Sequence, residues 1–259
     1  MSNSGFCALP FVQYSTYNGG RFRLCCMAKE PKELVNQEEL GIDGTWNHNY
    51  IKDVRRRMTA GEKLPECVEC HHLERNGIMS SRQWENKVWA DVIDDVVADA
   101  SANDWEIDQP LQFDFRLGNL CNLQCQMCNK EASHLVSVER ATMVQSGLGA
   151  NHPDWDGNIA NKKEALLQPG IEWESFERML PYARKIKLIG GEPTVATDMF
   201  KLLDKKWRNL IILELQDHIG KNTNSKEITN RNIYEGTEIE FQWLDEFSNH
   251  MITITGDVV

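Results

Sequence analysis

The stretch "FRLGNLCNLQCQMCNK", residues 115–130, places Cys121, Cys125 and Cys128 within eight residues. It overlaps "LQFDFRL" at 111–117, where apolar and polar residues alternate as they do in a β-strand. In a parallel α/β sheet, binding sites are built in the loops that follow the carboxyl ends of the strands. The three cysteines therefore predict a site at the start of an α/β domain.

Three thiolates in one loop are one fewer than a closed zinc or iron–sulfur site uses. A four-iron cluster held by three thiolates keeps one iron for a ligand that is not protein. Because an open coordination position generally serves chemistry, the spacing favours this interpretation. Two alternatives stay open: zinc with His134 as a fourth ligand, or a redox pair of Cys125 and Cys128, which leaves Cys121 unexplained.

Beyond residue 110, strand and helix patterns alternate along the chain. Strands are predicted at 111–117, 185–190, 210–216 and 251–255, with helical patterns such as "SHLVSVERATMV" and "TDMFKLLDKKW" between them. This alternation indicates βα units, and therefore an α/β fold with a largely parallel sheet.

The segment "KLIGGEPTV", residues 187–195, ends the second of these strands. Gly190 and Gly191 allow the backbone to bend tightly and to approach a ligand closely, Glu192 offers a carboxylate, and Pro193 stiffens the exit. Taken alone, the segment is an ordinary strand-to-helix turn. Because the cysteine loop lies one βα unit earlier, we expect the glycine carbonyls and Glu192 to line the same rim and to hold a ligand's ammonium group beside the open iron.

The other five cysteines lie before residue 71 and indicate a separate N-terminal module. We divide the chain into that module at 1–98, a polar linker at 99–110 and the α/β domain at 111–259. Within the module, the segments "ALPFVQYST" (8–16) and "GRFRLCCMA" (20–28) are predicted to form the strands of a hairpin around Asn18-Gly19-Gly20, and residues 46–59 an amphipathic helix. A further helix is predicted from the four-residue steps of Trp84, Val88, Val92 and Val96, whose side chains are expected in the core.

The five cysteines also fall into two local groups. Cys67 and Cys70 have the spacing of a metal knuckle, while Cys7, Cys25 and Cys26 lie on or beside the predicted hairpin. His71 and His72 follow the knuckle and are interpreted as solvated loop residues.

Composition narrows the function classes. The 259 residues carry a net charge of −11, which argues against a general phosphate-backbone binder, and the run Arg55-Arg56-Arg57 is interpreted as a solvated helix face. No stretch approaches the roughly 18 apolar residues of a membrane span, and the N-terminus lacks the pattern of a secretory signal. We therefore expect a cytoplasmic protein without membrane or nucleic-acid partners, whose reduced thiols are metal ligands or catalytic groups.

Cys121-x3-Cys125-x2-Cys128 after one strand, followed by Gly-Gly-Glu-Pro after the next, resembles the radical S-adenosylmethionine (SAM) enzymes. The resemblance implies a partial (β/α)6 TIM-like barrel with a [4Fe–4S] cluster on the three cysteines. It implies that SAM chelates the fourth iron through its amino and carboxylate groups and is cleaved reductively to a 5′-deoxyadenosyl radical. No side chain of the chain is assigned a catalytic role, and Gly190, Gly191, Glu192 and Pro193 are assigned to cofactor binding.

The N-terminal module is similar to the auxiliary-cluster fold called a twitch domain, a shorter relative of the SPASM domain. Its pattern is a cysteine, then Gly20-x4-Cys25, then a distant Cys-x2-Cys, and the combination resembles twitch-domain radical SAM proteins of phage and marine metagenomic type. The resemblance implies that an auxiliary [4Fe–4S] cluster is held by Cys7, Cys25, Cys67 and Cys70. Cys26 is an alternative to Cys25, and a zinc site with the same four thiolates stays open.

The resemblance weakens toward the end of the chain. Only about four of six βα units are predicted, so we expect a C-terminally truncated barrel, either completed by a second chain or a product of a split gene. The expected partners are a reductant such as ferredoxin or flavodoxin and a peptide or small-molecule substrate. The alternative function is a non-catalytic iron–sulfur or zinc-binding module, a remnant or half of a split barrel.

Overall fold

The computed structural model describes residues 5–29, 37–125, 128–149, 157, 161–192, 195–203, 212–217, 239–243 and 250–256. The last three ranges and residues 37–39, 200, 202 and 203 are described by their backbone alone. The chain forms two compact units. The first comprises Met1–Asp114 with Glu172–Ala183, and the second comprises Phe115–Ile171 with Arg184–Val259.

A small sheet organises the first unit. Strands β1 (Gln13–Thr16) and β2 (Phe22–Arg23) are antiparallel, and the 3-10 turn η1 (Asn18–Gly20) joins them. Gly19 has φ 72°, a left-handed conformation that glycine adopts without strain, so the predicted hairpin is confirmed. Strand β3 (Gln112–Arg116) begins in this unit and runs parallel to β1, with Tyr14 opposite Phe113.

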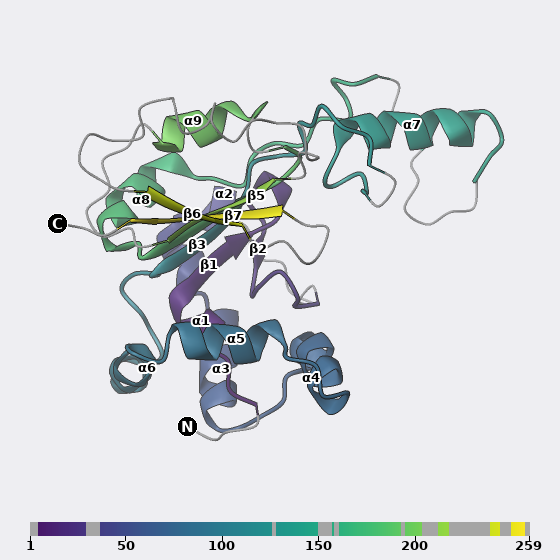
Figure 1. Ribbon diagram of the computed structural model, residues 1–259. Helices are drawn as coiled ribbons and strands as arrows, with labels where there is room; N and C mark the ends of the chain where they lie inside the picture. Colours follow the sequence, from purple (N-terminus) through teal and green to yellow (C-terminus); the bar gives the residue numbers. More distant parts are fainter. Residues whose placement is uncertain are drawn as a thin grey trace. The chain divides into compact units, whose positions relative to one another are not determined.

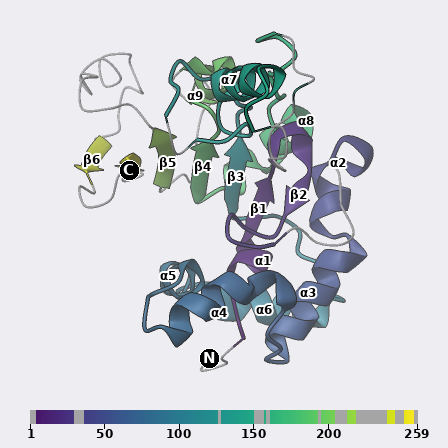
Figure 2. The same ribbon diagram turned by 90° about the vertical axis from the view of Figure 1, so that its right-hand side faces the viewer.

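Helices surround this sheet and bury its aromatic side chains. The short helix α1 (Leu9–Val12) packs against α3 (Asn49–Thr59), α5 (Ser81–Val88) and α6 (Ile93–Ala102), as Figure 2 shows. The other helices of the unit are α2 (Gln37–Trp46), the 3-10 turn η2 (Pro65–Cys67), α4 (Val68–Arg75), α8 (Trp173–Met179) and the 3-10 turn η3 (Leu180–Tyr182). The ring of Phe176 in α8 meets that of Phe113 at 5.0 Å.

Two details of the predicted module are wrong. Residues 9–12 form the helix α1 and not a strand, with Pro10 in its first turn, where a missing N–H costs nothing. The valine stripe belongs to two helices that break after Val88, and Trp84 is 56% exposed, so it is not a core residue. The valines themselves are partly buried against the cluster of Phe11, Trp89 and Val97.

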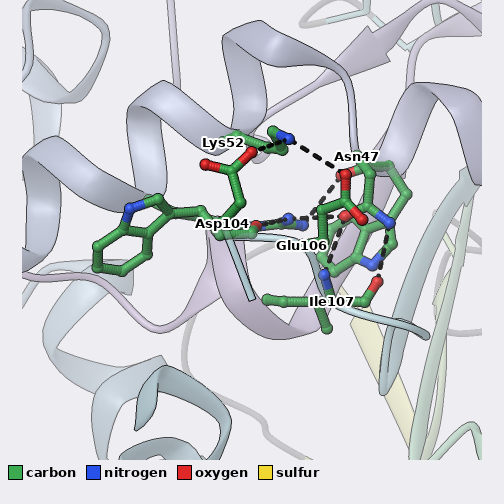
Figure 3. Close-up of polar contacts among 8 residues, drawn as sticks. Asn47, Lys52, Asp104, Glu106 and Ile107 are labelled. Carbon is green, nitrogen blue, oxygen red and sulfur yellow. Dashed lines mark hydrogen bonds and ion pairs between the residues drawn. The ribbon is translucent and has the colours of Figure 1, made fainter. Parts of the chain in front are cut away.

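The residues predicted as a linker are tied to the first unit (Figure 3). Helix α6 extends to Ala102, and Lys52 of α3 pairs with Asp104 at 2.6 Å and with Glu106 at 3.1 Å. Asn47 exchanges two hydrogen bonds of 3.0 Å with the backbone of Ile107. The domain division at 1–98, 99–110 and 111–259 stays a prediction, but 99–107 are held in place by these contacts.

Arg55 of α3 also binds the segment predicted as a linker, through the Trp105 carbonyl. It is therefore not part of the solvated helix face that the sequence predicts. Its side chain is 0% exposed. The guanidinium donates to the carbonyls of Pro10, Trp46 and Trp105 and to Asn47 Oδ1 over 2.8–3.0 Å, and it lies 4.2 Å from the Trp46 ring centre. The sequence could not separate it from its exposed neighbour Arg56, because helical phase alone decides which of them points inward.

The second unit contains a mixed sheet, visible in Figures 1 and 2. Strand β4 (Lys185–Ile189) is parallel to β5 (Ile212–Asp217), whereas β7 (His250–Gly256) is antiparallel to both β5 and β6 (Ile239–Trp243). Helices α7 (His134–Gln145) and α9 (Thr197–Leu203) follow the predicted positions. The α/β class is therefore confirmed, while the expectation of a largely parallel sheet is wrong beyond β5, and β6 was not predicted.

Within the described residues, no helix has both the length and the apolar character that crossing a membrane requires.

Candidate metal centres

Four cysteines of the first unit line one cavity, here called the four-thiol cavity. They are Cys7 just before α1, Cys25 after β2, Cys67 at the N-cap of α4 and Cys70 in its first turn. The cavity measures about 20 Å³ and is also lined by Leu9, Met27, Ala28, Ser81 and Arg82. The fold thus brings together the four cysteines assigned to the auxiliary cluster, whereas Cys26 is exposed and does not line the cavity.

Local structure explains how these segments meet. Pro65 opens the 3-10 turn η2, in which the Cys67 N–H donates to the Leu64 carbonyl at 3.0 Å. The x2 spacing then puts Cys70 one turn along α4 on the same side. The Lys29 N–H donates to the Glu66 carbonyl at 3.0 Å, which fixes the loop after Cys25 beside Cys67.

Burial governs the ionisation of these thiols. It raises the pKa of Cys7 well above the usual value, and it raises the pKa of Cys25 and of Cys67 to about 12, with the neighbouring thiols adding to each shift. The thiols of Cys7, Cys25 and Cys67 are therefore protonated at neutral pH in the metal-free chain. Because thiolates are the ligands, metal binding at this cavity must release protons.

The two histidines after the knuckle differ from each other, and only His71 differs from the prediction. His72 is exposed as expected, but His71 is only 6% exposed within α4. Its Nδ1 lies 3.6 Å from Glu74 Oε2. Burial, and then the positive charge of Arg82, lowers the pKa of His71.

The second candidate centre is the cysteine loop of the second unit, here called the three-thiol loop. Cys121 is buried and Cys125 and Cys128 are half-buried, while residues 126 and 127 lie outside the described part. The Cys128 N–H donates to the Cys125 carbonyl at 3.0 Å, and the Leu123 N–H donates to Cys121 Sγ at 3.4 Å. Burial raises the pKa of Cys121, and burial with the neighbouring thiols raises the pKa of Cys128.

Asn119 holds this loop from the inside. It is 0% exposed, and its amide donates to the carbonyls of Lys130 at 2.8 Å and of Ala165 at 2.9 Å. Its Oδ1 accepts from the Leu167 N–H at 2.8 Å. One side chain therefore fastens the two ends of the loop to a third segment.

The glycine pair after β4 lies directly against the three-thiol loop. A Cβ on Gly190 would lie 2.6 Å from the Gly118 carbonyl oxygen, and one on Gly191 would lie 2.1 Å from that of Leu120. The glycines therefore permit the close approach of one backbone to another, where the sequence predicted approach to a ligand. Hydrogen bonds accompany this contact, from the Gly191 N–H to Gly118 O at 3.0 Å and from the Glu192 N–H to Leu120 O at 2.8 Å.

The two other residues of the turn are Glu192 and Pro193. Glu192 is 1% exposed, and its charge contributes to the raised pKa of Cys121, after burial. Pro193 lies outside the described residues.

His134 was weighed as a fourth zinc ligand of the three-thiol loop. It is buried at the start of α7, and its Nδ1 lies 3.3 Å from the Cys121 nitrogen and 3.4 Å from the Asn119 oxygen. The Nδ1 atom of His134 therefore accepts a hydrogen bond from the backbone of the loop.

In the part of the chain that the structure describes, no three His, Cys, Asp or Glu side chains close around one point as ligands of a single metal ion would. Comparison of the chain with protein-family models, curated proteins and solved structures finds no match. The function is therefore inferred from the geometry of the two groups of thiols.

Proposed function

We propose that the chain is a radical SAM enzyme with two iron–sulfur clusters. In this proposal the three-thiol loop holds the cluster with an open iron, and the four-thiol cavity holds an auxiliary [4Fe–4S] cluster. The bound cofactors supply one-electron cleavage of the SAM sulfonium and hydrogen abstraction from a substrate, and the protein supplies binding and orientation.

One observation carries this proposal. The turn that ends β4 and the loop with Cys121 are locked together by backbone hydrogen bonds at distances where only glycine fits. This contact places the buried Glu192 in the electrostatic surroundings of Cys121. A carboxylate beside a cluster loop is suited to hold the ammonium group of an amino acid cofactor.

The donor sets of both centres fit the proposed groups. Thiolates are the ligands of iron–sulfur clusters, and three in one loop leave one iron without a protein ligand. The Cys121 N–H donates to His134 Nδ1 and the Asn119 amide donates to the Ala165 carbonyl, so the start of the loop is tied to two neighbouring segments. The remaining finer assignments, the partial (β/α)6 barrel and the twitch module, belong to the same proposal.

A non-catalytic iron–sulfur or zinc module is the second candidate. The four-thiol cavity favours the cluster-binding form of this candidate, because four thiolates complete the coordination of a cluster and leave no open position. Under the first proposal, the partners are a reductant such as ferredoxin or flavodoxin and a peptide or small-molecule substrate.

Anaerobic reconstitution with iron and sulfide tests the two candidates. We expect roughly eight irons per chain, and about four in a variant with Cys121, Cys125 and Cys128 all changed to Ala. Cys26→Ala is the matched control and should keep the full number. With dithionite and SAM, the wild-type chain should form 5′-deoxyadenosine, and SAM should change one of the electron paramagnetic resonance signals.

A chain with both centres filled that yields no 5′-deoxyadenosine would contradict the enzyme proposal and favour the non-catalytic module. Zinc in the three-thiol loop after anaerobic purification would contradict it as well.

A further inference from the structure

We propose that Arg82 is a positioning residue that sets the redox potential of the group bound in the four-thiol cavity, with Glu74 as its opposing charge. This inference rests on the proposed function only in requiring that the cavity binds a thiolate-held metal group.

Arg82 reaches the cavity from the first turn of α5. It lines the cavity together with the four cysteines and is 8% exposed. Its Nη1 donates to the Phe6 carbonyl at 2.6 Å, and Phe6 directly precedes Cys7 in the chain. The guanidinium therefore holds the segment that carries one of the four thiols.

Glu74 fixes the other side of the guanidinium. Arg82 Nε donates to Glu74 Oε1 at 2.9 Å, and Nη2 donates to Oε2 at 2.5 Å, which is a two-pronged ion pair. The carboxylate also accepts from Ser80 Oγ at 2.5 Å. Because Glu74 lies in α4 one turn after Cys70, the pair joins α5 to the helix of the knuckle.

The two charges of the pair are placed unequally. Arg82 lines the cavity, while Glu74 is not among its lining residues. The charge of Arg82 interacts electrostatically with the thiols of Cys7 and Cys67. The positive charge of Arg82 acts to lower the pKa of the Cys67 thiol, whereas the negative charge of the nearby Glu66 acts to raise it.

A fixed positive charge at this position favours the reduced state of a bound cluster. A cluster with four thiolates is negatively charged, and reduction adds another electron. Arginine does not lose its proton in proteins, and charges in a partly buried site are screened less than on the surface. Removing the charge should therefore lower the reduced-to-oxidised ratio at a given potential by roughly tenfold, which is about 59 mV for a one-electron couple.

The test is a redox titration followed by electron paramagnetic resonance. It uses the full chain with Cys121, Cys125 and Cys128 changed to Ala, so that only the four-thiol cavity gives a signal. Arg82→Gln should lower the midpoint potential by about 59 mV, which corresponds to the tenfold change in the reduced-to-oxidised ratio. Glu74→Gln should raise the midpoint potential. Arg82→Lys keeps the charge and should stay within about threefold of the parent chain.

Arg56→Gln is the matched control, because it removes the same charge from an exposed position on α3 and should shift the ratio less than twofold. A merely structural role for the pair predicts shifts of the same sign in Arg82→Gln and Glu74→Gln, since both would open the cavity to water. Shifts of the same sign, or no shift in either variant, would overturn the inference.

Cobalt(II) gives a second measurement that does not need an assembled cluster. Thiolate-to-cobalt absorption reports binding, and Arg82→Gln should weaken it by about tenfold while Arg56→Gln leaves it unchanged. Should Arg82→Gln fail to fold, Glu74→Gln and Arg82→Lys still decide, because Glu74→Gln must raise the midpoint potential while Arg82→Lys must leave it close to that of the parent chain. Failure of the parent chain to bind iron would contradict the auxiliary cluster, whereas bound iron with an unshifted potential would contradict the role of Arg82 alone.

Discussion

Gly191→Ala tests the contact on which the three-thiol loop depends. The added Cβ would lie 2.1 Å from the Leu120 oxygen, 2.5 Å from its carbonyl carbon and 2.7 Å from the Asn119 carbonyl carbon. Ordinary van der Waals contact begins near 3.4 Å, and all three atoms belong to backbone, so no side chain can rotate away. The loop must therefore withdraw from the turn by about the difference between 2.1 and 3.4 Å.

The cost has two parts. Withdrawal of the loop breaks or stretches the hydrogen bond from the Glu192 N–H to Leu120 O, now 2.8 Å, and a buried donor without a partner costs about 1–3 kcal/mol. Overpacking adds about 1–3 kcal/mol. We expect Gly191→Ala to lower the free energy of unfolding by about 2–6 kcal/mol and the midpoint temperature by roughly 4–24 °C.

Thermal unfolding of the metal-free chain, followed by circular dichroism, measures this change. Gly147→Ala is the matched control, because Gly147 is exposed, has φ +84° and has open space around its Cβ position. Backbone strain alone should cost that control about 1 kcal/mol. If Gly191→Ala unfolds at the same temperature as Gly147→Ala, the close approach of the turn to the loop is not what the structure indicates.

Three further predictions concern other polar side chains. Arg55→Met should lower the free energy of unfolding, measured in urea, by about 3 kcal/mol, because it leaves buried carbonyls without their hydrogen-bond donor. The control Arg56→Met, on the exposed face of the helix, should change this free energy by less than about 0.5 kcal/mol. Asn119→Ala should cost about 2–4 kcal/mol and reduce the iron retained by the three-thiol loop, which an iron assay of the reconstituted variant measures. Burial raises the pKa of Glu74, but hydrogen bonds from Arg82 and Ser80 outweigh it and lower the pKa overall. This stabilisation is present above the unfolded pKa near 4.5 and is lost as the pH falls through the folded value. The stability difference between the wild-type chain and Glu74→Gln should therefore shrink below about pH 4 in thermal scans, and a difference that grows on acidification would contradict the assigned sign.

Local patterns predicted the elements whose signal lies within a few residues. The strand before the three-thiol loop, the hairpin at Asn18-Gly19-Gly20 and helices α7 and α9 depend on alternation, turn residues and helical spacing, all of which can be read along the chain. The knuckle spacing of Cys67 and Cys70 belongs to the same class, because one helical turn fixes it. The assignment of Cys7 and Cys25 to the same site came only from resemblance.

Contacts between segments far apart in the sequence decided the features that local patterns did not predict. The antiparallel addition of β7 to β5 depends on which edge the returning chain meets, and a strand's own sequence does not encode that direction. Arg82 belongs to no sequence motif. It is singled out only because it lines a cavity whose other segments lie up to 75 residues earlier in the chain, at Cys7. The reason for Gly190 and Gly191 is likewise tertiary: glycine marks a close approach in the sequence, but only the packed backbone of Gly118–Leu120 shows what is approached.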